Sequence, residues 1–275
     1  MTSSATLGNQ NAHAPVGTAQ SPAPAQHAIE VVDVHKAFGS SRVLTGLSVN
    51  FVDNAVTTVL GPSGTGKSVL LKHIVGLLEP DHGEIRVFGE NIWNVSREER
   101  YELRKRFGVL FQDGALFGSM NLYDNVAFPL RKHTDKSERQ IREIVMDNLR
   151  EVGLEKAIDK APNEISGGMR KRAGFARALV MKPDVVLFDE PDSGLDPVRT
   201  KLLCNLISEV HNEHGGTYIV ITHDIPTART VSDYVAVLWQ GKLVNYGTAD
   251  EAFSSDDPFV RQFLSGGAVG PLGMD

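Results

Sequence analysis

Residues 61–68 read Gly61-Pro62-Ser63-Gly64-Thr65-Gly66-Lys67-Ser68, between a short apolar run at 55–60 and a segment with helical apolar spacing at 67–78. They fit the pattern G-x-x-x-x-G-K-[ST], in which a loop between a strand and a helix surrounds phosphates with backbone N–H groups. The glycines permit this close wrapping, and the start of the helix adds a favourable dipole. We therefore expect a nucleoside triphosphate to bind along the whole stretch, at Gly61, Pro62, Ser63, Gly64, Thr65, Gly66, Lys67 and Ser68.

Two side chains of this loop are expected to act directly on the ligand. Lys67 would reach the β- and γ-phosphates, and the hydroxyl of Ser68 would bind Mg²⁺. The alternative is a glycine-rich turn that contains a lysine by chance. The flanking strand and helix make that the weaker interpretation.

A pair of acids follows a second apolar run about 120 residues later. The sequence Val185-Val186-Leu187-Phe188-Asp189-Glu190 indicates a buried strand that ends in two carboxylates. Asp189 is expected to hold Mg²⁺ through water, and Glu190 to orient the attacking water or accept its proton. Alone, such a pair would be an ordinary surface feature. Together with the upstream loop, it predicts a Mg²⁺-dependent nucleoside triphosphatase.

A second candidate anion site lies at Ser166-Gly167-Gly168, just before a helix that contains Arg170, Lys171, Arg172 and Arg177. A hydroxyl, free N–H groups and a helix dipole would all face outward there. Since the chain already has one phosphate loop, this surface and its basic cluster are expected to contact a partner's nucleotide. An ordinary serine N-cap is equally compatible with the residues alone.

The remaining pattern indicates an α/β fold. Strands are predicted at 29–34, 47–52, 185–188 and 218–222, and helices at 136–152 and 198–211. Ser96 and Glu99 form a capping-box pattern that opens a charged helix to about residue 107. Strands that alternate with helices predict a mostly parallel sheet covered on both faces.

Composition limits the class of protein. The 275 residues carry a net charge of −6, which argues against bulk nucleic-acid binding. Their single cysteine, Cys204, favours a reducing compartment. Residues 1–27 have no charged side chain and are expected to form a disordered tail. No run approaches the roughly 18 apolar residues of a membrane span. No nucleic-acid partner is expected.

Over about residues 29–265 the sequence resembles the ATP-binding-cassette (ABC) family. Ser166, Gly167 and Gly168 match its signature motif, although Ile165 and Met169 replace the usual Leu and Gln. The resemblance assigns four further segments: Phe38 stacks on adenine, Gln112 of the Q-loop senses Mg²⁺ and water, His223 is the switch histidine beside the γ-phosphate, and Ser193-Gly194-Leu195-Asp196 is the D-loop.

The resemblance implies a P-loop NTPase ABC cassette at 28–265, with a short C-terminal tail at 266–275. Its parts would be a RecA-like core, an antiparallel β subdomain and an inserted α-helical subdomain at about 115–178. The cofactors would be ATP and Mg²⁺. Two copies would pack head to tail, so that each ATP lies between Lys67 of one copy and Ser166 of the other.

The segment after the Q-loop indicates which ABC ATPases this sequence resembles most. Gly114-Ala115-Leu116-Phe117 is similar to the ATPases of Mla- and Mce-type lipid transporters, most of all the actinobacterial Mce-associated ATPases. This implies lipid, fatty-acid or sterol transport through a YrbE-type permease with MCE-domain proteins. The chain would then be peripheral, at the cytoplasmic face of the inner (plasma) membrane. Leu116, Phe117 and Leu122 could form a groove for the permease or belong to the subdomain core.

Two alternatives share the same nucleotide motifs. One is the ATPase of a polar-solute ABC importer, which would differ only between the Q-loop and the signature. The other is a non-transport ABC protein of DNA repair or translation. Such proteins carry a long coiled coil or two cassettes, whereas this chain has one cassette and no heptad run.

Overall fold

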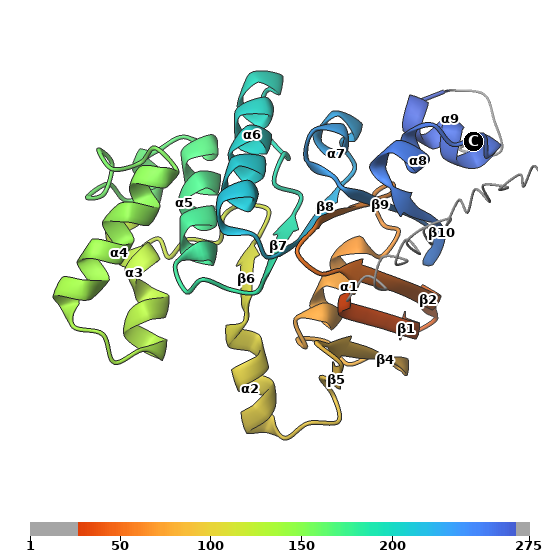
Figure 1. Ribbon diagram of the computed structural model, residues 1–275, viewed down its shortest axis with the longest axis horizontal. Helices are drawn as coiled ribbons and strands as arrows, with labels where there is room; N and C mark the ends of the chain where they lie inside the picture. Colours follow the sequence, from red (N-terminus) through yellow and green to blue (C-terminus); the bar gives the residue numbers. More distant parts are fainter. Residues whose placement is uncertain (1–26, 268–275) are drawn as a thin grey trace, which may run out of the picture.

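The computed structural model describes residues 27–267, and its largest element is a six-stranded sheet (Figure 1). The strand order is β10-β9-β3-β8-β7-β6, and all neighbours are parallel except β10 and β9. The predicted mostly parallel sheet is therefore confirmed. Its strands are β3 (Val56–Leu60), β6 (Phe107–Leu110), β7 (Val185–Asp189), β8 (Thr217–Thr222), β9 (Tyr234–Trp239) and β10 (Lys242–Thr248).

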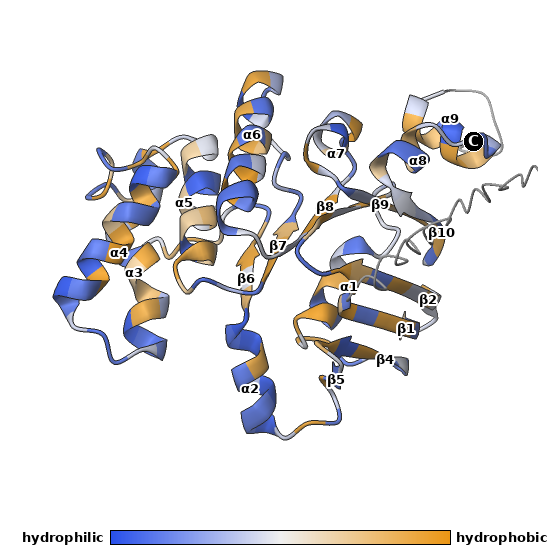
Figure 2. Cartoon of the chain, viewed as in Figure 1, coloured by the Kyte–Doolittle hydropathy of each residue, from blue (hydrophilic) through white to orange (hydrophobic). Residues whose placement is uncertain are grey.

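Both faces of this sheet are covered, because alternate side chains of its buried strands enter different cores. Val185 and Leu187 of β7 pack in one core with α1 (Lys67–Ile74), whereas Val186 and Phe188 pack in another with α6 (Pro197–His214). These strands are accordingly buried along almost their whole length and are largely apolar, as Figure 2 shows for β7 and β8, although β3 also buries Thr57 and Thr58. This is the pattern expected of a parallel sheet buried on both sides.

A second sheet forms the β subdomain. It has the order β2-β1-β4-β5 and consists of β1 (His27–Phe38), β2 (Ser41–Val52), β4 (His82–Val87) and β5 (Glu90–Asn91), all antiparallel. β1 begins at His27, so the last residue of the expected tail belongs to a strand. Residues 1–26 of that tail lie outside the described residues, as do residues 268–275.

A group of helices is inserted between β6 and β7 and projects to one side of the sheet (Figure 1). It contains α3 (Leu122–His133), α4 (Glu138–Glu151), a 3₁₀ turn (Pro162–Glu164) and α5 (Gly167–Leu179). Leu122 is fully buried in its core, and Leu116 packs against that core. Phe117 is instead 42% exposed, with its ring 4.9 Å from that of Phe128.

The helix boundaries follow local rules. α2 (Arg97–Lys105) has the predicted capping box between Ser96 and Glu99. α1 ends at Ile74, earlier than the apolar spacing suggested, because Gly76 adopts a left-handed conformation just after it. The chain continues through α7 (Ile225–Val231), α8 (Ala249–Phe253) and α9 (Pro258–Ser265). Within residues 27–267, none of the helices combines the length and apolarity that crossing a membrane requires.

Candidate nucleotide site

The loop between β3 and α1 contains two glycines at which any side chain would displace neighbouring atoms. A Cβ at Gly61 would lie 2.5 Å from the carbonyl oxygen of Leu238, and one at Gly66 would lie 2.7 Å from Leu44 Cδ2. Gly66 also has φ of 99°, in the left-handed region. The loop is therefore held between β9 and β2, with its backbone N–H groups at the start of α1.

Lys67 lies inside this loop. Its Nζ donates to the carbonyl oxygens of Gly61 and Pro62, at 2.7 and 2.8 Å, and the side chain is buried. Burial lowers the pKa of Lys67, while nearby Glu190 and Asp189 act in the opposite direction. Because of its two hydrogen bonds, the ammonium group is held by the carbonyl oxygens of the loop itself.

Ser68 and Asp189 meet at the end of β7. The Ser68 hydroxyl donates to Asp189 Oδ1 at 3.0 Å. Burial raises the pKa of Asp189, the Ser68 hydrogen bond opposes this shift, and adjacent Glu190 raises the pKa further. A hydroxyl and two crowded carboxylates are hard oxygen donors, and a divalent cation would relieve their mutual repulsion. These residues fit a Mg²⁺ site.

Glu190 occupies a conformation that non-glycine residues rarely adopt. Its φ is 47°, and its N–H donates to the Ile221 carbonyl of neighbouring β8 at 2.8 Å. Its Oε1 lies 3.5 Å from Nδ1 of His223, which follows β8. A left-handed backbone costs about 1–2 kcal/mol and often occurs at functional sites. Here it holds the carboxylate toward His223 at the edge shared by β7 and β8.

The loop, both acids and His223 all lie at or just after the carboxyl ends of β3, β7 and β8, which are adjacent in the sheet. In open α/β sheets, ligands bind at this edge. Gln112 follows β6, the next strand along, and its side chain is exposed. Phe38 ends β1 with 50% exposure, and Lys36 Nζ lies 5.8 Å from its ring centroid.

The Ser166 segment forms a helix start in a different part of the molecule. Ser166 Oγ accepts from the Met169 N–H at 3.3 Å as the N-cap of α5, and Gly167 and Gly168 follow it. Among residues 27–267, no hydrogen bond joins residues 166–168 to the loop at 61–68. Figure 1 shows α5 in the inserted helical group, whereas α1 packs with β1 and β2, so the two predicted phosphate-binding surfaces lie apart within one chain.

The four basic side chains after Ser166 bond within their own chain, and their expected contact with a partner's nucleotide stays a prediction. Each of the four donates to a backbone carbonyl oxygen of the same chain. The acceptors are Ile165 for Arg170, Glu190 for Lys171, Val152 for Arg172, and Gly114 with Ala115 for Arg177.

Sequence reasoning placed Lys171 and Arg177 in a basic cluster but missed the contacts that they make beside the nucleotide site. Lys171 Nζ donates to the Glu190 carbonyl and to Ser193 Oγ, both at 3.2 Å. Arg177 connects α5 to the segment that follows Gln112. Their positions on α5, six residues apart, give no signal of those distant acceptors.

Comparison with known proteins identifies the class. A family model described as ABC transporter matches residues 44–193, which is more than half of the chain. The chain belongs to the ABC transporter family and is an ATP-binding, ATP-hydrolysing subunit of a transporter.

Relatives give the comparison more detail. The chain is 54% identical over 247 residues to a probable ribonucleotide transport ATP-binding protein, mkl, of Mycobacterium leprae, covering 90% of this chain and 71% of that one. It is 43% identical over 244 residues to the intermembrane phospholipid transport system ATP-binding protein MlaF of Escherichia coli, covering 89% and 91%. These matches confirm the resemblance to Mkl- and Mla-like ATPases.

A solved structure supports the fold. The dimeric ATP-binding cassette MJ0796, in a post-hydrolysis state bound to ADP and Pi, matches with a TM-score of 0.73 and 27% identity. The match covers 80% of this chain and 98% of that one. The expected ABC-cassette fold is confirmed.

Proposed function

We propose that this chain powers an Mce/Mla-type ABC transporter that moves phospholipid, fatty acid or sterol across the cell envelope. The observation that carries the catalytic part is the convergence of Lys67, Ser68, Asp189, Glu190 and His223 at one edge of the sheet. Similarity to MlaF over nearly the full length of both chains supports the lipid part.

Mg²⁺ would be held by Ser68, Asp189 and Gln112, and when bound it would neutralise charge on the phosphates of ATP. Lys67 exchanges its bonds to the Gly61 and Pro62 carbonyls for bonds to phosphate oxygens. Phe38 offers its exposed ring face to the adenine. The backbone N–H groups of residues 61–68 complete the contact with the phosphates.

Glu190 acts as the general base. Its carboxylate accepts a proton from the attacking water, and its constrained backbone keeps that carboxylate at the edge of the sheet. His223 lies 3.5 Å away on the neighbouring strand end and contacts the γ-phosphate while it holds the Glu190 side chain. Lys171 positions Glu190 through its carbonyl oxygen.

The Ser166, Gly167 and Gly168 segment completes the site of a second copy. Because it lies apart from the loop of its own chain, two copies in a head-to-tail arrangement place each ATP between Lys67 of one and Ser166 of the other. The dimeric MJ0796 cassette supports such an assembly. The membrane partner is a YrbE-type permease linked to MCE-domain proteins, and the chain binds it at the cytoplasmic face of the inner (plasma) membrane.

The names of the relatives favour two cargoes. The mkl relative is named for ribonucleotide transport, and MlaF for phospholipid transport. We favour lipid because the segment Gly114-Ala115-Leu116-Phe117 is similar to that of lipid-transporter ATPases. A polar solute such as a ribonucleotide is the second candidate.

Purification from membranes with the co-purifying permease tests the cargo. We expect a YrbE-type permease with MCE-domain proteins, and ATPase activity of the reconstituted complex that rises with phospholipid or fatty acid. Recovery of a polar-solute permease, or stimulation by ribonucleotides alone, would overturn the lipid assignment and leave the ATPase assignment intact.

Glu190→Gln tests the catalytic assignment. Since a general base contributes about 10²–10⁴-fold to rate, we expect turnover to fall by that factor while ATP binding persists and closed dimers accumulate. Glu143→Gln is the control, because that side chain is 65% exposed on α4. Near-normal ATPase activity in Glu190→Gln would refute the role of Glu190.

A further inference from the structure

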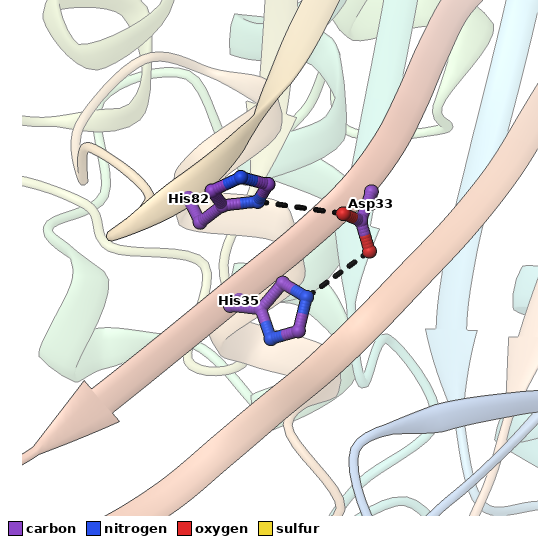
Figure 3. Close-up of side chains that lie close together, drawn as sticks. All are labelled: Asp33, His35 and His82. Carbon is purple, nitrogen blue, oxygen red and sulfur yellow. Dashed lines mark hydrogen bonds and ion pairs between the residues drawn. The ribbon is translucent and has the colours of Figure 1, made fainter.

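Three side chains with metal-binding atoms meet on an exposed part of the β subdomain. Figure 3 shows His35 and His82 directed toward the carboxylate of Asp33. His35 Nε2 lies 3.0 Å from Asp33 Oδ1, and His82 Nδ1 lies 3.4 Å from Asp33 Oδ2. One ligand atom from each residue lies within 4.8 Å of the other two.

The pairing of the strands brings these residues together. His35 of β1 lies directly opposite His82 of β4 in the antiparallel register. Between Val32 and His35 that register shifts, and Asp33 has φ of 47°. Such a bulge bends the strand and redirects a side chain. It turns the Asp33 carboxylate toward both imidazoles.

Neighbouring residues stabilise the bulge at Asp33 and leave the potential ligand atoms uncovered. The Ser48 hydroxyl of β2 accepts from the Asp33 N–H at 2.9 Å. Gly83 permits β4 to pass close to the Asp33 carbonyl oxygen, which a side chain at that position would block. A Cβ at Gly46 would lie 3.2 Å from Asp33 Oδ1 and 3.4 Å from His35 Nε2, so glycine there keeps the ligand atoms open.

We propose that Asp33, His35 and His82 form a binding site for a divalent transition metal ion of the Zn²⁺ class. Two imidazole nitrogens and one carboxylate oxygen are a donor set that Zn²⁺ accepts, with water in the fourth position. Zn²⁺–ligand distances of about 2.0–2.1 Å place tetrahedral ligand atoms about 3.3 Å apart. The two nitrogen–oxygen separations, 3.0 Å to Asp33 Oδ1 and 3.4 Å to Asp33 Oδ2, are close to this value, and one ligand atom from each residue lies within 4.8 Å of the other two. Mg²⁺ prefers an all-oxygen octahedral shell and is excluded by the two imidazoles.

The site would connect β1 to β4 close to the adenine end of the nucleotide site. Next to His82, Asp81 already binds Lys36 Nζ at 2.6 Å and the Ala37 N–H at 2.7 Å. A metal ion shared by His35 and His82 adds a second link between the same two strands. Because both links precede Phe38 on β1, the ion would order the strand end that carries this ring.

A second acidic group provides a matched control. Glu151, Glu213 and His214 also lie within 4.8 Å of one another, with His214 Nε2 2.7 Å from Glu151 Oε1. It has only one imidazole. A site with one nitrogen and two carboxylates binds Zn²⁺ less well than one with two nitrogens. This second group should therefore contribute little to Zn²⁺ uptake by the chain.

Zn²⁺ titration of the full chain, with Mg²⁺ in excess and no nucleotide, tests the proposal by calorimetry and by competition with a zinc-chelating dye. We expect one Zn²⁺ per chain. Its affinity should fall more than about 100-fold in His82→Ala and in Asp33→Asn, since loss of an outer-shell partner alone costs 10–100-fold. It should remain in His214→Ala.

Two further measurements keep the result interpretable. The thermal midpoint without metal should be equal in wild type and His82→Ala, because His82 is 72% exposed. Co²⁺ should give the visible absorption of a four-coordinate ion in wild type and not in His82→Ala. Absence of Zn²⁺ uptake by wild type, unchanged uptake in His82→Ala, or loss of uptake in His214→Ala would each overturn the proposal. None of these outcomes bears on ATP turnover, so this site and the proposed function fail independently.

Discussion

Replacing Arg177 by methionine should loosen the contact between α5 and the segment that follows Gln112. The guanidinium donates to the carbonyl oxygens of Gly114 and Ala115, at 3.1 and 2.8 Å, and lies 5.8 Å from the ring centroid of Phe117. Methionine keeps an unbranched apolar stem and has no donor. The variant therefore removes both bonds while it preserves most of the packing.

The expected loss of unfolding free energy depends on how exposed each of the two hydrogen bonds is. A hydrogen bond from a charged group contributes about 1.5–3 kcal/mol. The bond to Ala115 is exposed, so water can replace it, whereas the bond to Gly114 is partly buried. Burial lowers the pKa of Arg177, and the neutral variant escapes the cost of burying that charge. We expect a net loss of about 1.5–3 kcal/mol in unfolding free energy, or about 3–12 °C in the thermal midpoint.

Urea denaturation and calorimetry of Arg177→Met and Arg150→Met provide the measurement. Arg150 lies on α4, is 63% exposed and pairs with Asp147 within the same helix. Its replacement should change stability by less than about 0.5 kcal/mol, because exposed ion pairs contribute little. Equal stabilities of the two variants, or an Arg177→Met chain as stable as wild type, would refute this reasoning.

Three other perturbations test separate features of the fold. Burial lowers the pKa of His73, so the folded state binds a proton at this imidazole less tightly than the unfolded chain does. The unfolding free energy should therefore decline as the pH falls from about 7 toward 5. Urea titrations at each pH should show a less steep decline in His73→Gln. Gly108→Ala would press a Cβ onto the Ala178 carbonyl oxygen and should cost about 1–3 kcal/mol in urea, whereas Gly118→Ala, with open space around it, should cost less than about 0.5 kcal/mol. Burial raises the pKa of the Cys204 thiol, so a disulfide reagent should label it slowly in the native chain and rapidly in denaturant, and fast native labelling would contradict its buried position.

Local rules made much of this structure predictable. The loop at 61–68 and the cap at Ser96 follow from residue type and spacing within a few positions, because the interactions are between near neighbours. The buried strand before Asp189 follows from its uninterrupted apolar run. Such features need no knowledge of the distant chain.

Long-range contacts were not predictable in the same way. The acceptors of Lys171 lie 19 and 22 residues away and those of Arg177 lie 62 and 63 residues away, and nothing local selects them. The bulge at Asp33 depends on Gly83 of another strand. The short strand β6, four residues with a glycine, lacks a distinctive pattern and is fixed by its pairing with β7. The roles assigned to the site residues stay predictions until their variants are measured.

Asp189 follows Ser68 by 121 positions in the sequence, and this has a consequence for synthesis. At about 5–20 residues per second, the ribosome needs about 6–24 s after making the phosphate loop before it adds the acid that completes the site. During that interval the nascent loop has its lysine but neither of the two carboxylates. ATP that binds only the finished sheet would then favour the folded chain by about 2.7 kcal/mol at 100 times its Kd. The substrate of this protein would thereby assist its maturation in the cell.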